Sequence, residues 1–107
     1  MSIDYRSGIA IGWRLTGEEI KTFSTDSFED LVDNGYLINI DHYFDNSDWV
    51  FGLPYTSVSE GQIDVLNTYE LSAFIAESTP ILTRLWEKHL PNLKHPPISL
   101  ILYLEVY

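Results

Sequence analysis

Hydrophobic and polar residues alternate along several segments of the chain, which is the pattern of a β-strand. From Ile9 to Leu15, bulky apolar residues alternate with mostly small ones, so one face of the predicted strand is nearly bare. We expect a helix to pack closely on that bare face, in preference to a ligand groove there. The same alternation predicts strands over 36–41 and 49–58, with Pro54 at a sheet edge or a bulge.

The end of the sequence, residues 98–107, gives the most regular strand pattern. Leucine occupies every second position from Leu100 to Leu104, and Ile101 and Tyr103 lie between these leucines. Apolar residues on both faces are typical of a central strand that is covered on both sides. We therefore expect this strand in the interior of the sheet.

Two short helices are predicted between the first two strands. Thr16 and Glu19 have the spacing of a capping box, in which each side chain accepts a hydrogen bond from the other residue's backbone amide. This spacing predicts a helix over 17–23. It recurs ten residues later, where it starts a second helix that ends at Asn34-Gly35.

The second helix has an apolar stripe on one side and carboxylates on the other. Phe28, Leu31 and Val32 form the stripe, and at 100° per residue the acidic residues fall on the opposite side. These acidic residues are Asp26, its capping-box partner Glu29, Asp30 and Asp33. We expect the four carboxylates to project into solvent.

A short apolar run and a long helical period follow the third strand. Residues 63–66 predict a further short strand, and Asn67 then caps a helix that reaches Ser78. Pro80 starts another helix, which ends before Pro91. One apolar stripe passes through the proline in phase, so a single kinked helix is the alternative.

Together these elements predict an α+β fold in a single domain that covers residues 1–107. The expected order is β-α-α-β-β-α-α-β, which gives a mainly antiparallel sheet of about four strands with three to four helices. A chain of 107 residues is long enough for one domain with its own hydrophobic core.

The charge of the chain is concentrated in its middle. Between Leu15 and Ser78 there are thirteen carboxylates and one basic residue, Lys21, whereas each flanking segment has a net charge of +1. The overall charge of −10 is thus the sum of −12 in the middle and +1 at each end. Such a region repels nucleic acid and anionic membranes, and it attracts a basic protein, a cationic ligand or a divalent metal. Acidity that serves solubility alone is the alternative interpretation.

The sequence lacks the residue patterns of the common catalytic and cofactor sites. It has no cysteine, which excludes disulfides, thiolate catalysis and cysteine-ligated zinc. Its three histidines lie on different predicted elements and match no metal-binding or triad spacing. One of them, His89, ends a helix, where a cationic ring favours the helix dipole. We expect a protein that is not an enzyme, has no cofactor and, since it lacks signal-peptide and membrane-span patterns, is cytoplasmic.

The loop between the second and third strands combines acids with aromatic residues. Its aspartates and His42 suggest a metal site, but their spacing fits no calcium loop, so a turn stabilised by Asp and Asn side chains is preferred. Aromatic side chains beside acids can anchor a protein interface, although they can also complete a small core. The predicted partner-binding residues of the acidic helix and this loop are Asp26, Glu29, Asp30, Asp33, Asp41, Tyr43, Phe44, Asp45, Asp48 and Trp49.

A cysteine-free acidic α+β chain of this length, with TGEEI and TDSFEDLVDNG as acidic helices, resembles the small inhibitors encoded by phages and mobile elements. That class includes anti-CRISPR and DNA-mimic proteins. The resemblance implies an inhibitor that occludes a basic nucleic-acid-binding protein, such as a CRISPR effector or another defence nuclease. Because it rests on no family motif, it assigns no functional residue.

Mimicry of a whole DNA duplex makes a stricter demand on the charges. The duplex has about one charge per 1.7 Å of axis, and the four acids of the helix face are sparser than that. Full mimicry therefore also requires Asp41, Asp45, Asp48, Glu60 and Asp64.

Two other functions remain open. The chain is also similar in kind to bacterial immunity proteins that neutralise nuclease toxins. A self-associating regulatory protein, for instance a homodimer, would instead use apolar area near Pro54 or on the bare face of the first strand. Its assembly should depend weakly on salt, whereas the binding of a basic partner should weaken steeply as salt rises.

Overall fold

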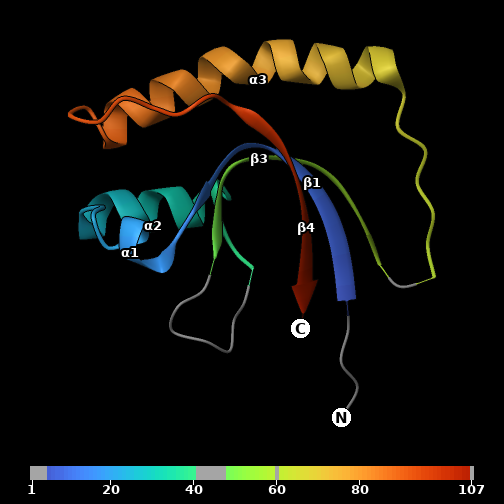
Figure 1. Cartoon of the computed structure of the whole chain (residues 1–107), viewed down its shortest axis with the longest axis horizontal. Coiled ribbons are helices and arrows are strands. Elements are labelled where there is room, and N and C mark those ends of the chain that lie inside the picture. Colours follow the sequence, from blue (N-terminus) through green and yellow to red (C-terminus); the bar gives the residue numbers. More distant parts are fainter. Residues whose placement is uncertain (1–4, 41–47, 60, 107) are drawn as a thin grey trace.

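The computed structural model describes residues 5–40, 48–59 and 61–106, and within them it shows an α+β fold with a four-stranded antiparallel sheet and three helices. In Figure 1 the long helix lies over the curved sheet, and the two short helices lie at one end of the molecule. The elements are β1 (Tyr5–Leu15), α1 (Gly17–Ile20), α2 (Thr25–Asp33), β2 (Leu37–Asn39), β3 (Trp49–Ser59), α3 (Thr68–His89) and β4 (Ser99–Val106). The predicted fold class is confirmed, with one helix fewer than in the predicted order.

The strands lie in the order β2-β3-β1-β4, and each pairs antiparallel with its neighbour. β1 pairs with β4 from Tyr5 to Gly12 and with β3 from Arg6 to Leu15. The last strand is therefore at an edge of the sheet, and the prediction of an interior position was wrong. The sequence pattern shows that both faces of this strand are apolar, but it does not show whether another element covers those faces or pairs with the strand.

Pro54 lies both at a bulge and at a sheet edge, the two positions that the sequence offered for it. The register between β1 and β3 shifts at this point, because Ile9 pairs with Thr56 and Ala10 pairs with Pro54, which leaves Tyr55 as the extra residue of a bulge. β2 pairs only with residues 49–51 of β3, so Pro54 also lies beyond the end of that strand. A residue without an amide hydrogen is tolerated there, since no ladder partner requires it.

Among the described residues, no helix covers the bare face of β1, contrary to the prediction. The Tyr103 ring of β4 lies over Gly8, where a Cβ would stand 2.3 Å from the ring. Gly12 faces Gly52 of β3, and a Cβ on Gly12 would stand 2.1 Å from the carbonyl oxygen of Phe51. The small residues therefore make room for a neighbouring ring and for the neighbouring backbone, both within the sheet.

The two short helices start at their own N-caps. The capping box of α1 is confirmed, since the Glu19 amide donates to Thr16 Oγ1 at 3.2 Å and the Thr16 amide donates to Glu19 Oε1 at 3.1 Å. α1 ends at Ile20, before the predicted residue 23. The N-cap of α2 is Ser24, whose Oγ accepts from the Ser27 amide at 3.1 Å. The predicted capping box of Asp26 and Glu29 is therefore wrong, because the helix has already begun at those positions.

α3 is one helix that passes through Pro80, so the alternative of a single helix is confirmed and the prediction of two helices is wrong. Ser78, Leu82 and Trp86 form its buried stripe, which continues in phase across the proline. Burial of that stripe outweighs the hydrogen bond that Pro80 cannot donate. The predicted strand over 63–66 is also wrong, because this segment is irregular and largely exposed.

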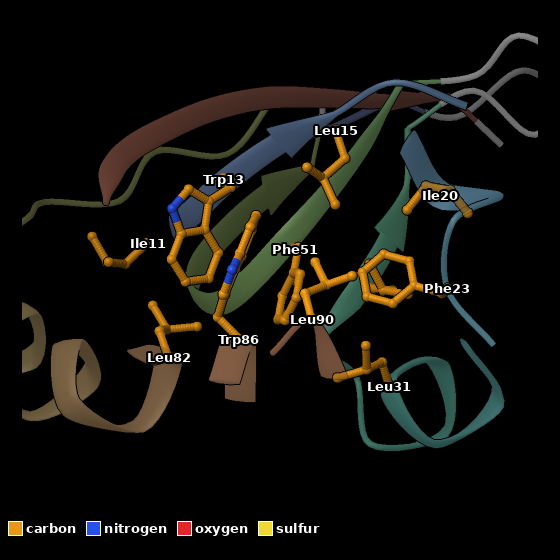
Figure 2. Close-up of a cluster of buried hydrophobic side chains, with 11 residues drawn as sticks. Ile11, Trp13, Leu15, Ile20, Phe23, Leu31, Phe51, Leu82, Trp86 and Leu90 are labelled. Carbon is orange, nitrogen blue, oxygen red and sulfur yellow. The ribbon is translucent and has the colours of Figure 1, made fainter. Parts of the chain in front are cut away.

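The main core lies between the sheet and the C-terminal half of α3, with α1 and α2 closing one end (Figure 2). Trp13 packs against Trp86 with 4.8 Å between ring centroids and against Phe51 at 5.2 Å. Both buried indoles find acceptors on the connector after α3: Trp13 Nε1 donates to the Pro96 carbonyl at 2.8 Å, and Trp86 Nε1 donates to the Leu93 carbonyl at 2.7 Å. These bonds fix the route from α3 into β4.

Candidate functional site: the acidic lobe

The acidic lobe is defined here as residues 16–34, which contain α1 and α2. It contains six carboxylates and one basic residue, Lys21, and all seven of these residues are exposed. α2 packs beside β2, so the lobe lies toward that edge of the sheet. The carboxylates are those of Glu18, Glu19, Asp26, Glu29, Asp30 and Asp33.

The predicted acidic face of α2 is confirmed as exposed. Leu31 is fully buried and Phe28 is half-buried, which fixes the helix on the core with its four acidic residues in solvent. Within the part of the chain that the structure describes, Asp26, Glu29 and Asp33 form no salt bridge. Their charge is therefore not neutralised by a described cation.

Asp30 differs from these three acids because it also contacts α3. Its Oδ2 lies 3.9 Å from Lys88 Nζ and 3.4 Å from His89 Nε2. Within α2, the Asn34 side-chain amide donates to the Asp30 carboxylate at 3.1 Å. Asp30 is thus exposed on one side and engaged with α3 on the other.

His89 forms the centre of this junction between α2 and α3. Its side chain is only 4% exposed, and its Nδ1 lies 2.8 Å from Ser27 Oγ, 62 residues away along the chain. Burial lowers the pKa of His89 below its usual value; the Lys88 charge lowers it further, and Asp30 opposes both effects. The ring therefore favours the neutral form, which contradicts the prediction of a cationic ring at the helix end.

Ser27, His89 and Asp30 have the composition of a catalytic triad, but their geometry does not support that function. The 3.4 Å approach of Asp30 to His89 Nε2 is not a hydrogen bond, so the carboxylate does not orient the ring as a triad acid does. Asp26 and Asp30 also line the shallow depression beside Ser27, where they would repel the anionic transition state of acyl transfer. We interpret the cluster as a polar junction between two helices.

The described part of the predicted loop contributes to packing. Asp48 Oδ2 accepts from Arg14 Nη2 at 2.8 Å, so this carboxylate already has a cationic partner. Trp49 is half-buried: it packs edge-on against Phe28 of α2 at 5.5 Å and lies against the main core. The remaining predicted residues, Asp41, Tyr43, Phe44 and Asp45, lie outside the described residues, as do His42 and Glu60.

Asp64 lies far from the acidic lobe. The hydroxyl of Thr56 donates to its carboxylate at 2.8 Å, next to the half of β3 that lies beyond Pro54. Figure 1 shows the segment before α3 and the two short helices at opposite sides of the molecule. Of the acids that full mimicry would add and that the structure describes, Asp48 is paired with Arg14 and Asp64 belongs to the segment on the opposite side of the molecule.

Sequence reasoning missed Ser27, Glu18 and the role of His89. Glu18 stands one residue before the capping glutamate on α1 and could have been found from the same charge count. The contact between Ser27 and His89 had no local signal, because it depends on how α2 and α3 cross.

Among residues 5–40, 48–59 and 61–106, no three His, Asp or Glu side chains are grouped so that they could hold a metal ion. In the same residues, no helix is both long enough and apolar enough to cross a membrane. Comparisons with protein-family models, curated proteins and solved structures find no match to this chain.

Proposed function

We propose that the chain is a small acidic inhibitor that binds a basic, nucleic-acid-binding protein, such as a CRISPR effector or another defence nuclease, through the acidic lobe. The observation that carries the proposal is the set of Asp26, Glu29 and Asp33. These three exposed carboxylates lie on one anchored helix and have no salt-bridge partner among the described residues. These carboxylates can pair with basic groups of a partner without first breaking a salt bridge within the chain.

The anchoring of α2 also supports the proposal. Leu31 holds the helix on the core, and the contact of Phe28 with Trp49 ties it to β3. Carboxylates on a fixed helix lose less conformational freedom on binding than carboxylates on a loose segment do. A fixed acidic surface suits a partner whose own basic groups are arranged to hold phosphates.

The small extent of the lobe defines the kind of occlusion that we propose. The lobe would occupy one cluster of basic residues on the partner, and the rest of the molecule would block access to the nucleic acid sterically. Replacement of a complete duplex is not required, which agrees with the pairing of Asp48 and with the place of the segment before α3, which contains Asp64, on the opposite side of the molecule from α1 and α2 (Figure 1).

The test removes charge from the lobe without changing its shape. The triple variant Asp26→Asn, Glu29→Gln, Asp33→Asn raises the net charge by three and leaves Asp30, the contact of α2 with His89, in place. The matched control Glu70→Gln, Glu77→Gln, Glu87→Gln makes the same change of charge on exposed positions of α3. Basic proteins captured from a lysate by the wild-type chain are purified and used as the probe for both variants.

We expect the lobe variant to associate with the captured protein about ten-fold more slowly, or slower still, at low salt, and the control to bind nearly as the wild type does. The difference should shrink as salt is raised. The captured protein should also lose affinity for a labelled DNA or RNA duplex when the wild-type chain is added. Equal losses for the two variants would show that only net charge matters, and unchanged binding of the lobe variant would remove the lobe from the interface.

A further inference from the structure

The outer edge of β4 lacks the usual protection of a sheet edge over most of its length. β4 is eight residues long and pairs with β1 on one side, while no strand of the described residues lies on its other side. Natural sheet edges are commonly protected by charged side chains, prolines or short length. The segment from Ser99 to Leu104 contains neither a charged residue nor a proline.

A row of leucines lies along this edge. Leu100, Leu102 and Leu104 are 52%, 77% and 48% exposed. β1 and β4 pair Leu102 with Ile9, so the row is on the same sheet face as the main core, beyond the part that the core occupies. A groove of about 110 Å³ continues from the row. Its apolar lining is Ile9, Val58, Leu66 and Leu102, and its polar lining is Ser7, Thr56, Ser57 and Asp64. Contiguous apolar area at a protein surface is typical of sites that a partner covers.

The distribution of charge indicates which partner covers it. β1 and β4 come from the two slightly basic ends of the sequence, whereas the acidic lobe lies toward the opposite edge, beside β2. A strongly basic partner would find no charge to pair with along Ser99–Leu104. A neutral apolar strand fits this edge, and a second copy of β4 is such a strand.

We infer that the β4 edge is a homodimer interface, in which two copies of β4 pair antiparallel about a two-fold axis and join the two sheets into one of eight strands. With the axis at Leu102, Leu100 of one copy lies opposite Leu104 of the other. Antiparallel pairing about such an axis keeps both leucine rows on the same face of the joined sheet, where they contact each other. This inference does not rest on the proposed function.

The arrangement also limits repulsion between two copies that each have a net charge of −10. Because α2 packs at the β2 edge, pairing at β4 directs the two acidic lobes to the outer ends of the dimer. Charges separated by more than a Debye length, about 10 Å at 0.1 M salt, are largely screened. Added salt should therefore preserve or strengthen the dimer, which is the opposite of its expected effect on a basic partner.

The first test is sedimentation velocity over a wide range of protein concentration. We expect the wild type to be dimeric and Leu102→Lys to be monomeric, because two lysines would meet across the axis. The matched control Ile63→Lys changes a 93% exposed apolar residue that belongs to no strand, in the irregular segment before α3, and should remain dimeric. Circular dichroism reports whether each variant is folded. A wild type that stays monomeric at millimolar concentration, or a dimer that Leu102→Lys leaves intact, would overturn the inference.

A second test fixes the register and does not depend on a disruptive variant. The chain has no cysteine, so any disulfide in a single-cysteine variant joins two copies. Cα atoms directly opposite in antiparallel strands are about 4.5–5.5 Å apart, within the range that a disulfide spans. Leu102→Cys should therefore form a covalent dimer under mild oxidation much faster than Ile63→Cys. Equal crosslinking of the two variants would contradict the inference, as would pairing of β4 with a strand of an unrelated protein in place of its own copy.

Discussion

The two edges of the sheet differ in length, charge and cover. The β2 edge is three residues long, and α2 packs beside it with an acidic outer surface. The β4 edge is eight residues long and presents leucines without a charge between Ser99 and Leu104. Water solvates the carboxylates of the first edge well, but it solvates the leucines of the second poorly. One small domain thus presents an acidic surface at the β2 edge of its sheet and an apolar surface at the β4 edge, and these two surfaces suit different kinds of partner.

The largest expected effect compares buried and exposed leucines. Leu82→Ala removes a fully buried side chain of α3 and should lower the free energy of unfolding by about 2–5 kcal/mol. Leu102→Ala, at concentrations where the chain is monomeric, should change it by about 0.5 kcal/mol or less. Urea denaturation measures both values. A large loss for Leu102→Ala in the monomer would mean that the β4 edge serves the fold, and the contrast between the edges would fail.

A smaller effect is expected at the start of the acidic lobe. Ser24→Ala removes the oxygen that accepts from the Ser27 amide at the N-terminus of α2 and should cost about 1 kcal/mol. Ser72→Ala, at an exposed position within α3, serves as the control and should not lower stability. The same denaturation series checks both variants. If Ser24→Ala were neutral, Ser24 would not be the residue that fixes the start of the lobe.

The junction behind the lobe should make stability depend on pH. Because the pKa of His89 is lowered in the folded chain, the unfolded chain binds more protons below pH 6.5. Stability from this group is therefore present above pH 6.5 and is lost as the pH falls below that value toward the lowered pKa. His89→Gln keeps a side chain that can hydrogen-bond to Ser27 and should flatten this part of the profile relative to the wild type. Denaturation midpoints of both chains measured between pH 5 and 8 decide the matter, and identical profiles for His89→Gln and the wild type would exclude the junction as the cause.

The smallest effect is expected at the ion pair of Arg14 and Asp48. Both side chains are substantially exposed, so Asp48→Asn should cost at most about 1 kcal/mol, and less as salt is raised. The same binding assay can then compare Asp48, a carboxylate paired with Arg14, with the carboxylates of α2. If Asp48→Asn bound the captured protein as weakly as the lobe variant does, the binding site would extend beyond α2.

Most of the local structure was predictable because it depends on residues close together in the sequence. The capping box of Thr16 and Glu19, the end of α2 at Asn34-Gly35 and the bulge or edge at Pro54 all follow from backbone groups that near neighbours satisfy. The acidic face of α2 was predictable for the same reason, since helical period alone sets it opposite Leu31.

Most of the errors concern how elements are arranged in space, whereas the capping box at Asp26 and the strand over 63–66 were errors of local structure. The tyrosine over Gly8 comes from a strand more than ninety residues away, and the junction of Ser27 with His89 spans 62 residues. The assignment of β4 to an interior position failed because sheet order depends on which strands pair, and the pattern within one strand does not contain that information. The sequence did not decide whether α3 is one helix or two helices divided at Pro80. Packing of the buried stripe against the core decides this, and it favours one helix.

By itself, the sequence determined the element types, the class of the fold and the concentration of acid in the middle of the chain. Only the tertiary structure decided that Asp26, Glu29 and Asp33 have no salt-bridge partner among the described residues, that the His89 side chain is buried behind α2 and that the leucines of β4 face solvent at an edge. The physical reason is the sequence separation of the groups that interact. Helix caps and helical periodicity depend on residues a few positions apart, whereas burial depends on every element that packs nearby, however distant in the sequence.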